Sequence, residues 1–384
     1  MSLRVLHVIP SIAPRYGGRS HTVVRYCRAL RQHGIRVTVA TTHADGAGVL
    51  DVPTGEAAEY EGVEARFFVR RGEALKYSPS LSKWLRKSVA DFDVVHIHAV
   101  FSHASLSAGR ACRIAGVPYI VRPLGSLGPW SLMQHAWRKR ALMWSAAGSL
   151  LRNAAGLHFT TEGEREAATA AVGECPGRVI PLGVDDHYLT TRVSAVGGRR
   201  VVVLVRLDRK RNLGSLIRAF HASAAASDWR LTIAGAGDVA YAEELRRAAL
   251  DGAAASRIDF LPWLDGEEKL KLLRSASVFA VPSFRENFGL GALEAMACGV
   301  PVLVSRGVNL APAIAQADAG WITGTDDEEI AATLTEAMRD EVGRRRRAAN
   351  ARKLASNYTW DSAAALLEVW YMALTPRLTE STRN

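Results

Sequence analysis

One short segment, residues 278–304, constrains the fold of this chain more than any other part of it. It reads VFAVPSFRENFGLGALEAMACGVPVLV: an apolar strand, a turn, a glycine-rich helix entry, a helix, a Gly-Val-Pro stop and a second apolar strand. This order of elements predicts a strand–helix–strand unit, whose two strands lie parallel in one sheet. The segment therefore favours an α/β fold.

The same segment carries two carboxylates around a helix entry. Glu286 precedes the expected helix and Glu294 lies inside it, and the residues between them, 287–291, include two glycines. The first amides of a helix lack partners and attract anions, whereas carboxylates suit sugar hydroxyls better than phosphate. The combination indicates a ligand that is part phosphate and part polyol, as a nucleotide sugar is. The plainer alternative is an ordinary βαβ unit with two solvated glutamates.

The strand–helix rhythm occurs twice along the 384 residues, a length that suits two domains. It begins with an apolar strand at Leu3–Ile9 and continues through Val94–His98. It starts again with the strand Val201–Leu204, and the weakly periodic stretch Asp185–Arg200 between the two series is the expected break. The pattern predicts two Rossmann-like domains with doubly wound parallel sheets and a cleft between them.

We place the first domain at residues 1–187, the second at 188–360, and a terminal helix with its tail at 361–384. The helix at Ser362–Ala373 is expected to cross back to the first domain. Its residues at core spacing are Leu366, Leu367, Trp370 and Ala373.

Charge is distributed unevenly. The formal net charge is +11, and no carboxylate occurs between Asp93 and Glu162. Basic residues fall within that gap, namely Arg110, Arg113, Arg122, Arg138, Lys139, Arg140 and Arg152. A one-sided field of this kind favours an anionic partner such as a membrane surface or a phosphate. Nucleic acid is not expected, because no nucleic-acid-binding motif accompanies the charge.

A segment inside that gap, Trp130–Asn153, is expected to form one helix. Met133, Trp137, Trp144 and Leu151 would make an aromatic-rich stripe beside residues 138–140. Tryptophan next to a basic cluster suits a helix that lies in the membrane interface. The alternative is a core stripe with solvated charges.

The chain is expected to be cytoplasmic. Its N-terminus lacks the features of a signal peptide, and no apolar stretch is long enough to cross a membrane. The four cysteines, at positions 27, 112, 175 and 298, show no metal or disulfide spacing. A peripheral position on the inner face of the membrane is the second possibility, through Trp130–Asn153.

At this point the chain resembles the retaining nucleotide-sugar glycosyltransferases of family 4, the group 1 type with the GT-B fold. The resemblance rests on the pair Glu286 and Glu294, on Gly17-Gly18, on Val205–Leu213 as a phosphate-binding segment, on the glycine turn Ile233–Gly237, and on Tyr358-Thr359-Trp360 before the terminal helix. It implies transfer of a sugar from a nucleoside diphosphate to an acceptor hydroxyl with the anomeric configuration kept. It implies no protein nucleophile.

The resemblance also assigns residues to roles. Arg206 and Arg211 would neutralise charge on the diphosphate, Glu286 would bind sugar hydroxyls, and these three are the implied catalytic residues. The implied donor-binding residues are Gly17, Gly18, Lys210, Gly235, Gly237, Asn287, Phe288, Gly289, Leu290 and Glu294, the last of them at the ribose diol. The candidates on the acceptor side are His98 and Gly125. No metal or other cofactor is expected, because a cationic clamp replaces it.

The chain departs from the family pattern at three positions. Val205 replaces the usual glycine, Arg211 replaces the usual lysine, and Leu124 replaces a histidine that normally contacts the donor sugar. These changes keep two alternatives open: a nucleotide-sugar epimerase or phosphorylase on the same architecture, and a non-catalytic partner protein with this fold. The expected function remains a glycosyltransferase of cell-surface polysaccharide or glycolipid synthesis, with a nucleotide-sugar donor and a sugar or lipid-linked acceptor.

Three further patterns have simpler interpretations. His96 and His98 are expected on opposite faces of their strand, so they should not share a metal, although His98 could reach the cleft. Asp91-Phe92-Asp93 matches a metal-binding motif of another glycosyltransferase fold but precedes its strand, which disfavours a metal there. Arg344–Arg347 is expected to be a solvated helix face.

Overall fold

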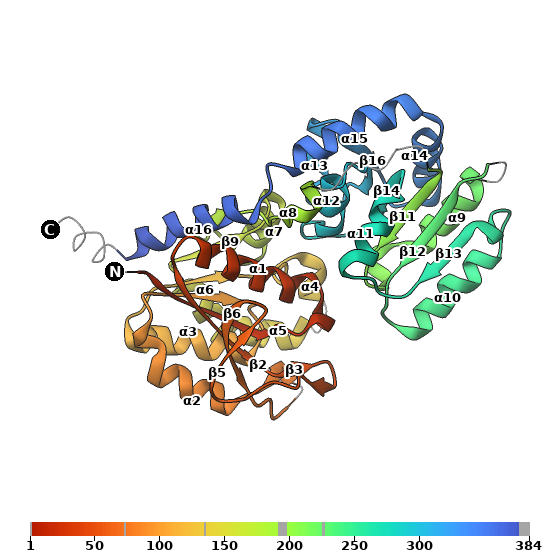
Figure 1. Ribbon diagram of the computed structural model, residues 1–384. Coiled ribbons are helices and arrows are strands. Elements are labelled where there is room, and N and C mark those ends of the chain that lie inside the picture. The colour runs from red at the N-terminus through yellow and green to blue at the C-terminus, as the bar shows by residue number, and fades with distance from the viewer. Residues whose placement is uncertain (1, 73, 134–135, 191–197, 225–226, 376–384) are drawn as a thin grey trace. The chain divides into compact units, whose positions relative to one another are not determined.

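Two separate sheets, one in each half of the chain, organise the fold in the computed structural model (Figure 1). The structure describes residues 2–72, 74–133, 136–190, 198–224 and 227–375. Unit 1 comprises Met1–Gly183 together with Trp360–Asn384, and unit 2 comprises Val184–Thr359. The expectation of two α/β domains with largely parallel sheets is confirmed. The chain crosses between units after Gly183, where the sequence placed the boundary after residue 187.

The sheet of unit 1 has eight strands in the order β10-β9-β8-β7-β1-β2-β6-β5, and only the β5–β6 pair is antiparallel. The strands are β1 (Arg4–Ser11), β2 (Arg36–Thr42), β5 (Ala57–Tyr60), β6 (Val63–Phe68), β7 (Val94–His98), β8 (Tyr119–Arg122), β9 (Gly156–Phe159) and β10 (Gly177–Val179), with a separate hairpin of β3 (Ala44–Asp45) and β4 (Gly48–Val49). Central strands such as β7 and β8 are buried along their whole length. Helices on both faces of a parallel sheet produce this burial.

The helices of unit 1 begin and end where local sequence dictates. They are α1 (Gly18–Gln32), α2 (Pro79–Ser88), α3 (His103–Ala115), α4 (Pro129–Met133), α5 (Ala136–Trp144), α6 (Ala146–Arg152), α7 (Glu162–Val172) and α16 (Trp360–Leu374), with short 3-10 turns η1 (Pro14–Tyr16), η2 (Ala74–Lys76) and η3 (Val89–Asp91). Ser102 and Thr161 cap α3 and α7, because each side chain accepts an amide of the first turn. Gly116 ends α3 in the left-handed conformation.

The terminal helix α16 packs along α1 within unit 1 (Figure 1). His33 at the end of α1 contacts both Glu368, at 2.8 Å, and Asp361, at 3.0 Å. Leu367 and Trp370 are buried as expected, but Leu366 and Ala373 are exposed, so that part of the prediction is wrong. The buried face of α16 uses smaller and more polar residues instead, namely Ala363, Ala364 and Tyr371.

Unit 2 is built on a parallel sheet of six strands in the order β13-β12-β11-β14-β15-β16. The strands are β11 (Arg200–Leu204), β12 (Arg230–Ala234), β13 (Ile258–Leu261), β14 (Val278–Val281), β15 (Val302–Ser305) and β16 (Gly320–Thr323). The helices are α8 (Asp186–Thr190), α9 (Leu213–Ala224), α10 (Val239–Leu250), α11 (Gly266–Arg274), α12 (Leu290–Ala297), α13 (Ala311–Gln316), α14 (Asp327–Arg339) and α15 (Glu341–Ala355), with 3-10 turns η4 (Arg209–Arg211) and η5 (Ala255–Arg257).

One expectation about surface helices is wrong, and another holds only in part, because Arg345 and Arg346 are exposed but Arg344 is not. The segment 130–153 is divided among α4, α5 and α6, and Ser145, with φ −112° and ψ −106°, breaks the last two apart. In the run Arg344–Arg347, Arg344 is buried and its guanidinium donates to the carbonyls of Ala337 and Met338 at 2.7 Å each. Arg347 lies over the Trp321 ring, 4.5 Å from its centre. Residues three apart share a helix face, and here that face points inward.

Candidate active site

The residues of unit 2 that are expected to bind the donor follow the carboxyl ends of β11, β12 and β14, whereas Gly17 and Gly18 lie in unit 1. The loop after β14 is held between the loops after its two neighbouring strands. Phe284 N donates to Lys210 O at 2.9 Å, and Glu286 N donates to Gly307 O at 2.9 Å. Parallel strands present their carboxyl ends at one edge of the sheet, which is where α/β folds place ligands. Backbone pairing therefore fixes the loop that carries Glu286.

Glu286 forms an ion pair with Arg211, so the structure brings two of the three expected catalytic residues together. The side chains of Arg211 and Glu286 are only 15% and 20% exposed, respectively. Water screens a charge pair at such a buried position only weakly. Arg206 is placed differently. Its side chain is about half exposed, and its nearest carboxylate oxygen, on Asp208, is 3.7 Å away.

A tight turn orients Arg211. Asp208 accepts the amide of Lys210 at 3.1 Å and so caps η4. Asn212 follows in the left-handed conformation, with φ 55°, and its Nδ2 donates to Thr325 O at 2.7 Å. Asparagine tolerates this conformation better than most residues, which explains its place at the end of the turn. The turn thereby fixes Arg211 at the end of η4, just before α9 begins.

The helix entry before α12 depends on one glycine. Gly289 has φ 101°, a conformation that L side chains rarely adopt, and it precedes Leu290, the first helical residue. The Phe288 ring is buried and meets the Tyr358 ring edge-on at 6.1 Å, so this residue can offer a ligand only its backbone. Asn287 O accepts from Asn309 Nδ2 at 3.2 Å. The amides at the start of α12 stay available to an anion.

Glu294 lies one turn inside α12 and is 7% exposed. Lys269 of α11 contacts its Oε2 at 2.7 Å, and the Lys269 ammonium lies 5.5 Å from the centre of the Tyr188 ring. Sequence reasoning missed both Lys269 and Tyr188. Neither stands next to a recognisable motif, and only the tertiary fold brings α8, α11 and α12 together.

Two glycines expected to touch the donor have a packing role in this structure. A Cβ at Gly235 would overlap the Val205 carbonyl, and one at Gly237 would overlap the Leu207 carbonyl. The two segments run side by side, and Leu207 N donates to Ala236 O at 3.0 Å. Because they allow this approach, the glycines support the loop that carries Arg206.

In unit 1, Gly17 and Gly18 form the entry to α1. Gly17 is its N-cap, with φ 67° and ψ −148°, and Gly18 is its first residue. Gly125 has φ 71° and its amide donates to Glu164 Oε1 at 2.8 Å. Leu124 before it has φ 57°, which is uncommon for a side chain of this size. A buried carboxylate thus supports a strained turn after β8.

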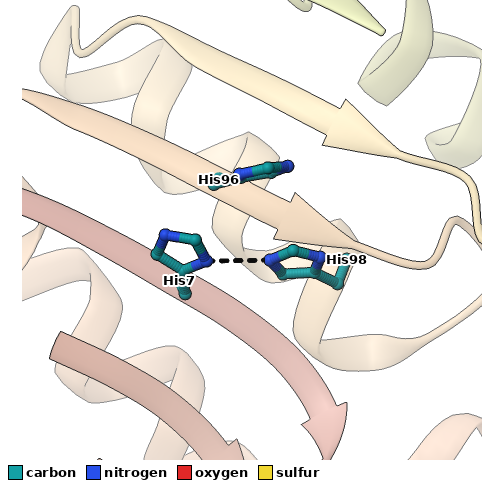
Figure 2. A group of neighbouring side chains, drawn as sticks. All are labelled: His7, His96 and His98. Carbon is teal, nitrogen blue, oxygen red and sulfur yellow. Dashed lines mark hydrogen bonds between the residues drawn. The ribbon is translucent and has the colours of Figure 1, made fainter. Parts of the chain in front are cut away.

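Two statements about His96 and His98 are corrected by the structure. Residues two apart on a strand share a face, and the two rings stack with centroids 4.3 Å apart. The expectation of opposite faces is wrong, because side chains on a strand repeat every two residues. His98 is fully buried and its Nε2 lies 3.0 Å from His7 Nδ1 (Figure 2), so a role in acceptor contact does not fit this placement.

A fourth histidine, His158, extends this buried cluster. Its Nε2 donates to Ile180 O at 2.9 Å, so its Nδ1 accepts from His96 Nε2 at 3.2 Å. His96 Nδ1 in turn accepts from the Tyr371 hydroxyl at 2.7 Å, which joins α16 to the sheet. The Ile180 carbonyl can only accept, so it fixes the direction of every hydrogen bond from His158 through His96 to Tyr371.

The histidines are neutral. Burial and the nearby Arg122 cation lower the pKa of His7 to about 3, and the same two causes lower the pKa of His158 to about 3. The pKa values of His96 and His98 also fall well below the usual value, again mainly through burial.

His7, His96 and His98 could place one nitrogen each near a metal ion. Their arrangement argues against it. Both His96 nitrogens already have partners, stacked rings direct their lone pairs apart, and Arg122, itself 2% exposed, adds a buried positive charge. The Asp91–Asp93 motif has a structural role as well, since Asp93 Oδ2 accepts the Arg4 amide at 2.7 Å.

Comparison with known proteins gives matches in both units. Residues 193–354 match the family described as "Glycosyl transferases group 1", and residues 17–183 match the "Glycosyl transferase 4-like domain". The chain belongs to the group 1 glycosyl transferases. This membership favours the transferase over the epimerase and phosphorylase alternatives.

Among curated relatives of this group 1 chain, the phosphatidyl-myo-inositol mannosyltransferase of Mycolicibacterium smegmatis is 28% identical over 94% of the chain and 92% of its own length. The D-inositol 3-phosphate glycosyltransferase of Corynebacterium efficiens is 34% identical, over 38% of the chain. That match covers only 35% of the length of this relative, and the match to the same enzyme of Salinispora arenicola covers 34%.

Solved structures show the fold of this group 1 chain. Anabaena Alr3699/HepE, crystallised with UDP and glucose, has a TM-score of 0.77 at 19% identity and covers 97% of the chain and 100% of its own. Sucrose-phosphate synthase from Thermosynechococcus elongatus has a TM-score of 0.80 at 20% identity, covering 97% and 99%. The expected GT-B architecture is confirmed.

The departures from the family pattern have local explanations. Val205 is 9% exposed and packs in the core of unit 2, where its amide donates to Ala234 O at 3.1 Å. Arg211 keeps a cation where the family has lysine, and its fork suits a carboxylate. Leu124 is 9% exposed and offers little more than its backbone.

Proposed function

We propose that this chain is a retaining glycosyltransferase that moves a sugar from a nucleoside-diphosphate sugar to an acceptor hydroxyl. The observation that carries the proposal is the pair of carboxylates around the entry of α12, each held by its own cation. Glu286 is paired with Arg211, and Glu294 with Lys269. A nucleotide sugar presents hydroxyls at both ends and negative charge in the middle, which this arrangement complements.

The residues divide the chemistry between them. Arg206 and Arg211 neutralise the negative charge that grows on the diphosphate as the glycosidic bond breaks, which stabilises the transition state. Amides at the start of α12 bind the same group. Glu286 accepts from sugar hydroxyls and Glu294 from the ribose. We assign no protein nucleophile and no metal, because the arginines supply the charge that a metal would otherwise provide.

The first test is thermal unfolding of the protein with UDP, GDP, ADP or CMP. A ligand at about 100 times its dissociation constant stabilises the folded protein by roughly 2.7 kcal/mol. We expect a shift with one diphosphate, and we expect Glu294→Ala to reduce it clearly. Glu268→Ala, which changes an exposed carboxylate of α11, is the control and should keep the shift. If none of the four nucleotides shifts the unfolding temperature, the donor site is misassigned.

Turnover tests the second carboxylate. Glu286→Ala should lower turnover with the sugar nucleotide, while the affinity for the bare diphosphate changes little. The configuration of the product, read by nuclear magnetic resonance, should match that of the donor. An inverted product would refute the retaining assignment, and full turnover in Glu286→Ala would remove this residue from the site.

For the acceptor we propose a lipid-linked or phosphate-bearing molecule at an anionic membrane surface, as part of cell-surface polysaccharide or glycolipid synthesis. The support lies in α4 and α5, where Met133, Trp137 and Trp144 are 68%, 72% and 89% exposed. Exposed tryptophans beside basic residues suit an interfacial position. Leu151, the fourth residue of the expected stripe, is buried, and the side chain of Arg138 in the neighbouring basic cluster lies outside the described side chains.

Only some of the basic residues in the carboxylate-free stretch can support docking to a membrane. Arg122 of the carboxylate-free stretch is buried beneath the Tyr26 ring and contributes nothing to a surface. Among the residues that the structure describes, no helix is long and apolar enough to cross a membrane.

Co-sedimentation with vesicles of anionic phospholipid at low salt tests the docking surface. We expect binding that Trp137→Ser/Trp144→Ser weakens strongly and that added salt reduces. The control is Trp263→Ser, which removes an exposed tryptophan of unit 2. Failure of the unaltered protein to sediment with the vesicles would refute this part of the proposal.

A further inference from the structure

Lys269 is an unusual lysine, because its ammonium is withdrawn from solvent. It lies in the first half of α11, and its side chain is 16% exposed. The ammonium contacts Glu294 Oε2 at 2.7 Å and lies near the face of Tyr188, a residue that is itself 5% exposed. Buried lysines are rare unless they are paired, so the position of Lys269 calls for an explanation.

The ion pair with Lys269 compensates Glu294 for its loss of hydration. A carboxylate that is 7% exposed loses most of its hydration, and without a partner it would tend to take up a proton or turn toward water. For Lys269 itself, burial opposes the charged form, but the Glu294 carboxylate and the Tyr188 hydroxyl outweigh it and raise the pKa. Lys269 therefore remains charged in the folded protein.

The contact also determines the direction of the carboxylate. Lys269 engages Oε2, and this contact restricts the orientation of the Glu294 carboxylate. Tyr188 limits the freedom of the lysine from the other side. A ligand hydroxyl then meets an acceptor that is already oriented, and little conformational entropy is lost on binding.

We propose that Lys269 is a positioning residue that holds the Glu294 carboxylate oriented for the ribose hydroxyls of the donor nucleotide. This inference rests on the proposed function, because it takes Glu294 as the ribose contact. Lys269 acts through Glu294 and touches neither the sugar nor the phosphates. It follows that the discrimination between ribose and 2′-deoxyribose nucleotides depends on a lysine outside the expected motifs.

The experiment is a comparison of dissociation constants for a nucleoside diphosphate and its 2′-deoxy analogue, measured by calorimetry. The nucleotide is whichever of UDP, GDP or ADP the unaltered protein binds. We expect the unaltered protein to prefer the ribose form about tenfold, the worth of one hydrogen bond to a charged group. Lys269→Met should weaken binding of the ribose form and leave the deoxy form nearly unchanged, so the preference disappears.

Three companion variants make the result decisive. Lys269→Arg keeps the cation and should retain most of the preference. Lys271→Met makes the same change at an exposed lysine of α11 and should behave like the unaltered protein. If Lys269→Met does not fold, the double variant Lys269→Met/Glu294→Gln, which leaves no unpaired charge, takes its place and should also lack the preference.

The outcomes separate the two proposals. If the unaltered protein binds no diphosphate, the proposed function fails. A second outcome is that the unaltered protein prefers the ribose form, that Glu294→Gln abolishes this preference, and that Lys269→Met keeps it. This outcome would refute the positioning role of Lys269, while the proposed function would stand. Equal weakening of both nucleotides in Lys269→Met would show a purely structural role and would also overturn the inference.

Discussion

Each unit buries a group of titratable side chains, but the two groups differ in charge. In unit 1 the cluster of His7, His96, His98 and His158 is neutral, with burial and Arg122 lowering each pKa. In unit 2 the carboxylates Glu286 and Glu294 each contact a cation. Similar burial thus produces an uncharged network in one unit and paired ions in the other.

The difference comes from the charges around each buried group. Burial alone disfavours every charged form, and a like charge such as Arg122 increases that penalty for an imidazole. A partner of opposite charge favours the charged form, and Glu286 and Glu294 each contact such a partner. A neutral network ties strands and helices together, whereas a charged side chain at a sheet edge can bind a ligand. We therefore assign stability to the first and binding to the second.

The largest expected difference between the histidine cluster of unit 1 and the site of unit 2 is in catalytic activity. Arg206→Ala should lower kcat by roughly 100-fold or more, the usual consequence of losing one contact to transition-state charge. Arg206 is about half exposed, so its removal should leave the stability of the fold nearly unchanged. Steady-state kinetics with the donor identified by thermal unfolding measures the change.

Arg209 provides the matched control for that variant. It lies three residues further along the same segment, is largely exposed and pairs with Glu244 at 2.6 Å. Arg209→Ala should retain nearly full turnover. Equal losses in the two variants would indicate a general effect of positive charge rather than a site at Arg206.

Acidification should reveal the neutral cluster. His7 and His158 have a pKa of about 3 in the folded protein, against 6.5 in the unfolded chain. The unfolded chain therefore binds more protons below pH 6.5, so stability that is present above this pH is lost as the pH falls toward 3. We expect a loss of about 1.4 kcal/mol per pH unit for each of these histidines.

Urea unfolding between pH 7.5 and pH 5, followed by circular dichroism, measures that loss. His158→Gln has no imidazole to protonate at this position. The dependence of its unfolding free energy on pH should therefore be less steep, by the contribution of one histidine. A stability that stays flat over this range would show that the histidines are protonated in the folded state, and the comparison between the units would then fail.

A smaller effect concerns the link between the cluster and the terminal helix. Tyr371→Phe removes the hydroxyl that donates to His96 Nδ1. A buried acceptor left without a donor costs about 1–3 kcal/mol, so the free energy of unfolding should fall by that amount while nucleotide affinity stays the same. Tyr77→Phe, at an exposed tyrosine, should change neither quantity. Lost nucleotide binding in Tyr371→Phe would contradict the division of roles.

The smallest effect has the opposite pH dependence. Hydrogen bonds to Glu368 and Asp361 raise the pKa of His33. Its contribution is fully present below pH 6.5 and is lost as the pH rises through the raised folded value. The pair is partly exposed, so we expect less than about 1 kcal/mol. The difference in thermal midpoint between the unaltered protein and His33→Gln, measured at pH 6 and pH 9, should shrink at the higher pH.

Much of this site could be predicted from local sequence. The strand–turn–helix pattern placed Glu286 before a helix and Glu294 inside it, and the structure has both in those positions. The glycine at 289 was expected at the helix entry, where a positive φ requires it. These features depend on neighbours within a few positions of the chain.

Other features could not be predicted, because their partners are distant in sequence. The Lys269–Glu294 pair joins separate helices, and the buried Arg344 depends on which face of α15 meets the core. His98 was assigned to a ligand site, but its neighbour His7 lies 91 positions away on another strand. Leu366 has the spacing of a core residue and is nevertheless exposed.

The sequence by itself determined the two parallel-sheet units, the helix entry at Gly289 and the carboxylates beside it, because periodicity and turn chemistry act locally. Only the tertiary structure decided which of the buried titratable groups carry charge. Charge in the interior depends on the sign and distance of the nearest side chain, and that neighbour comes from whichever strand or helix the fold places alongside. The same physics left the histidines of unit 1 neutral and kept the glutamates of unit 2 paired.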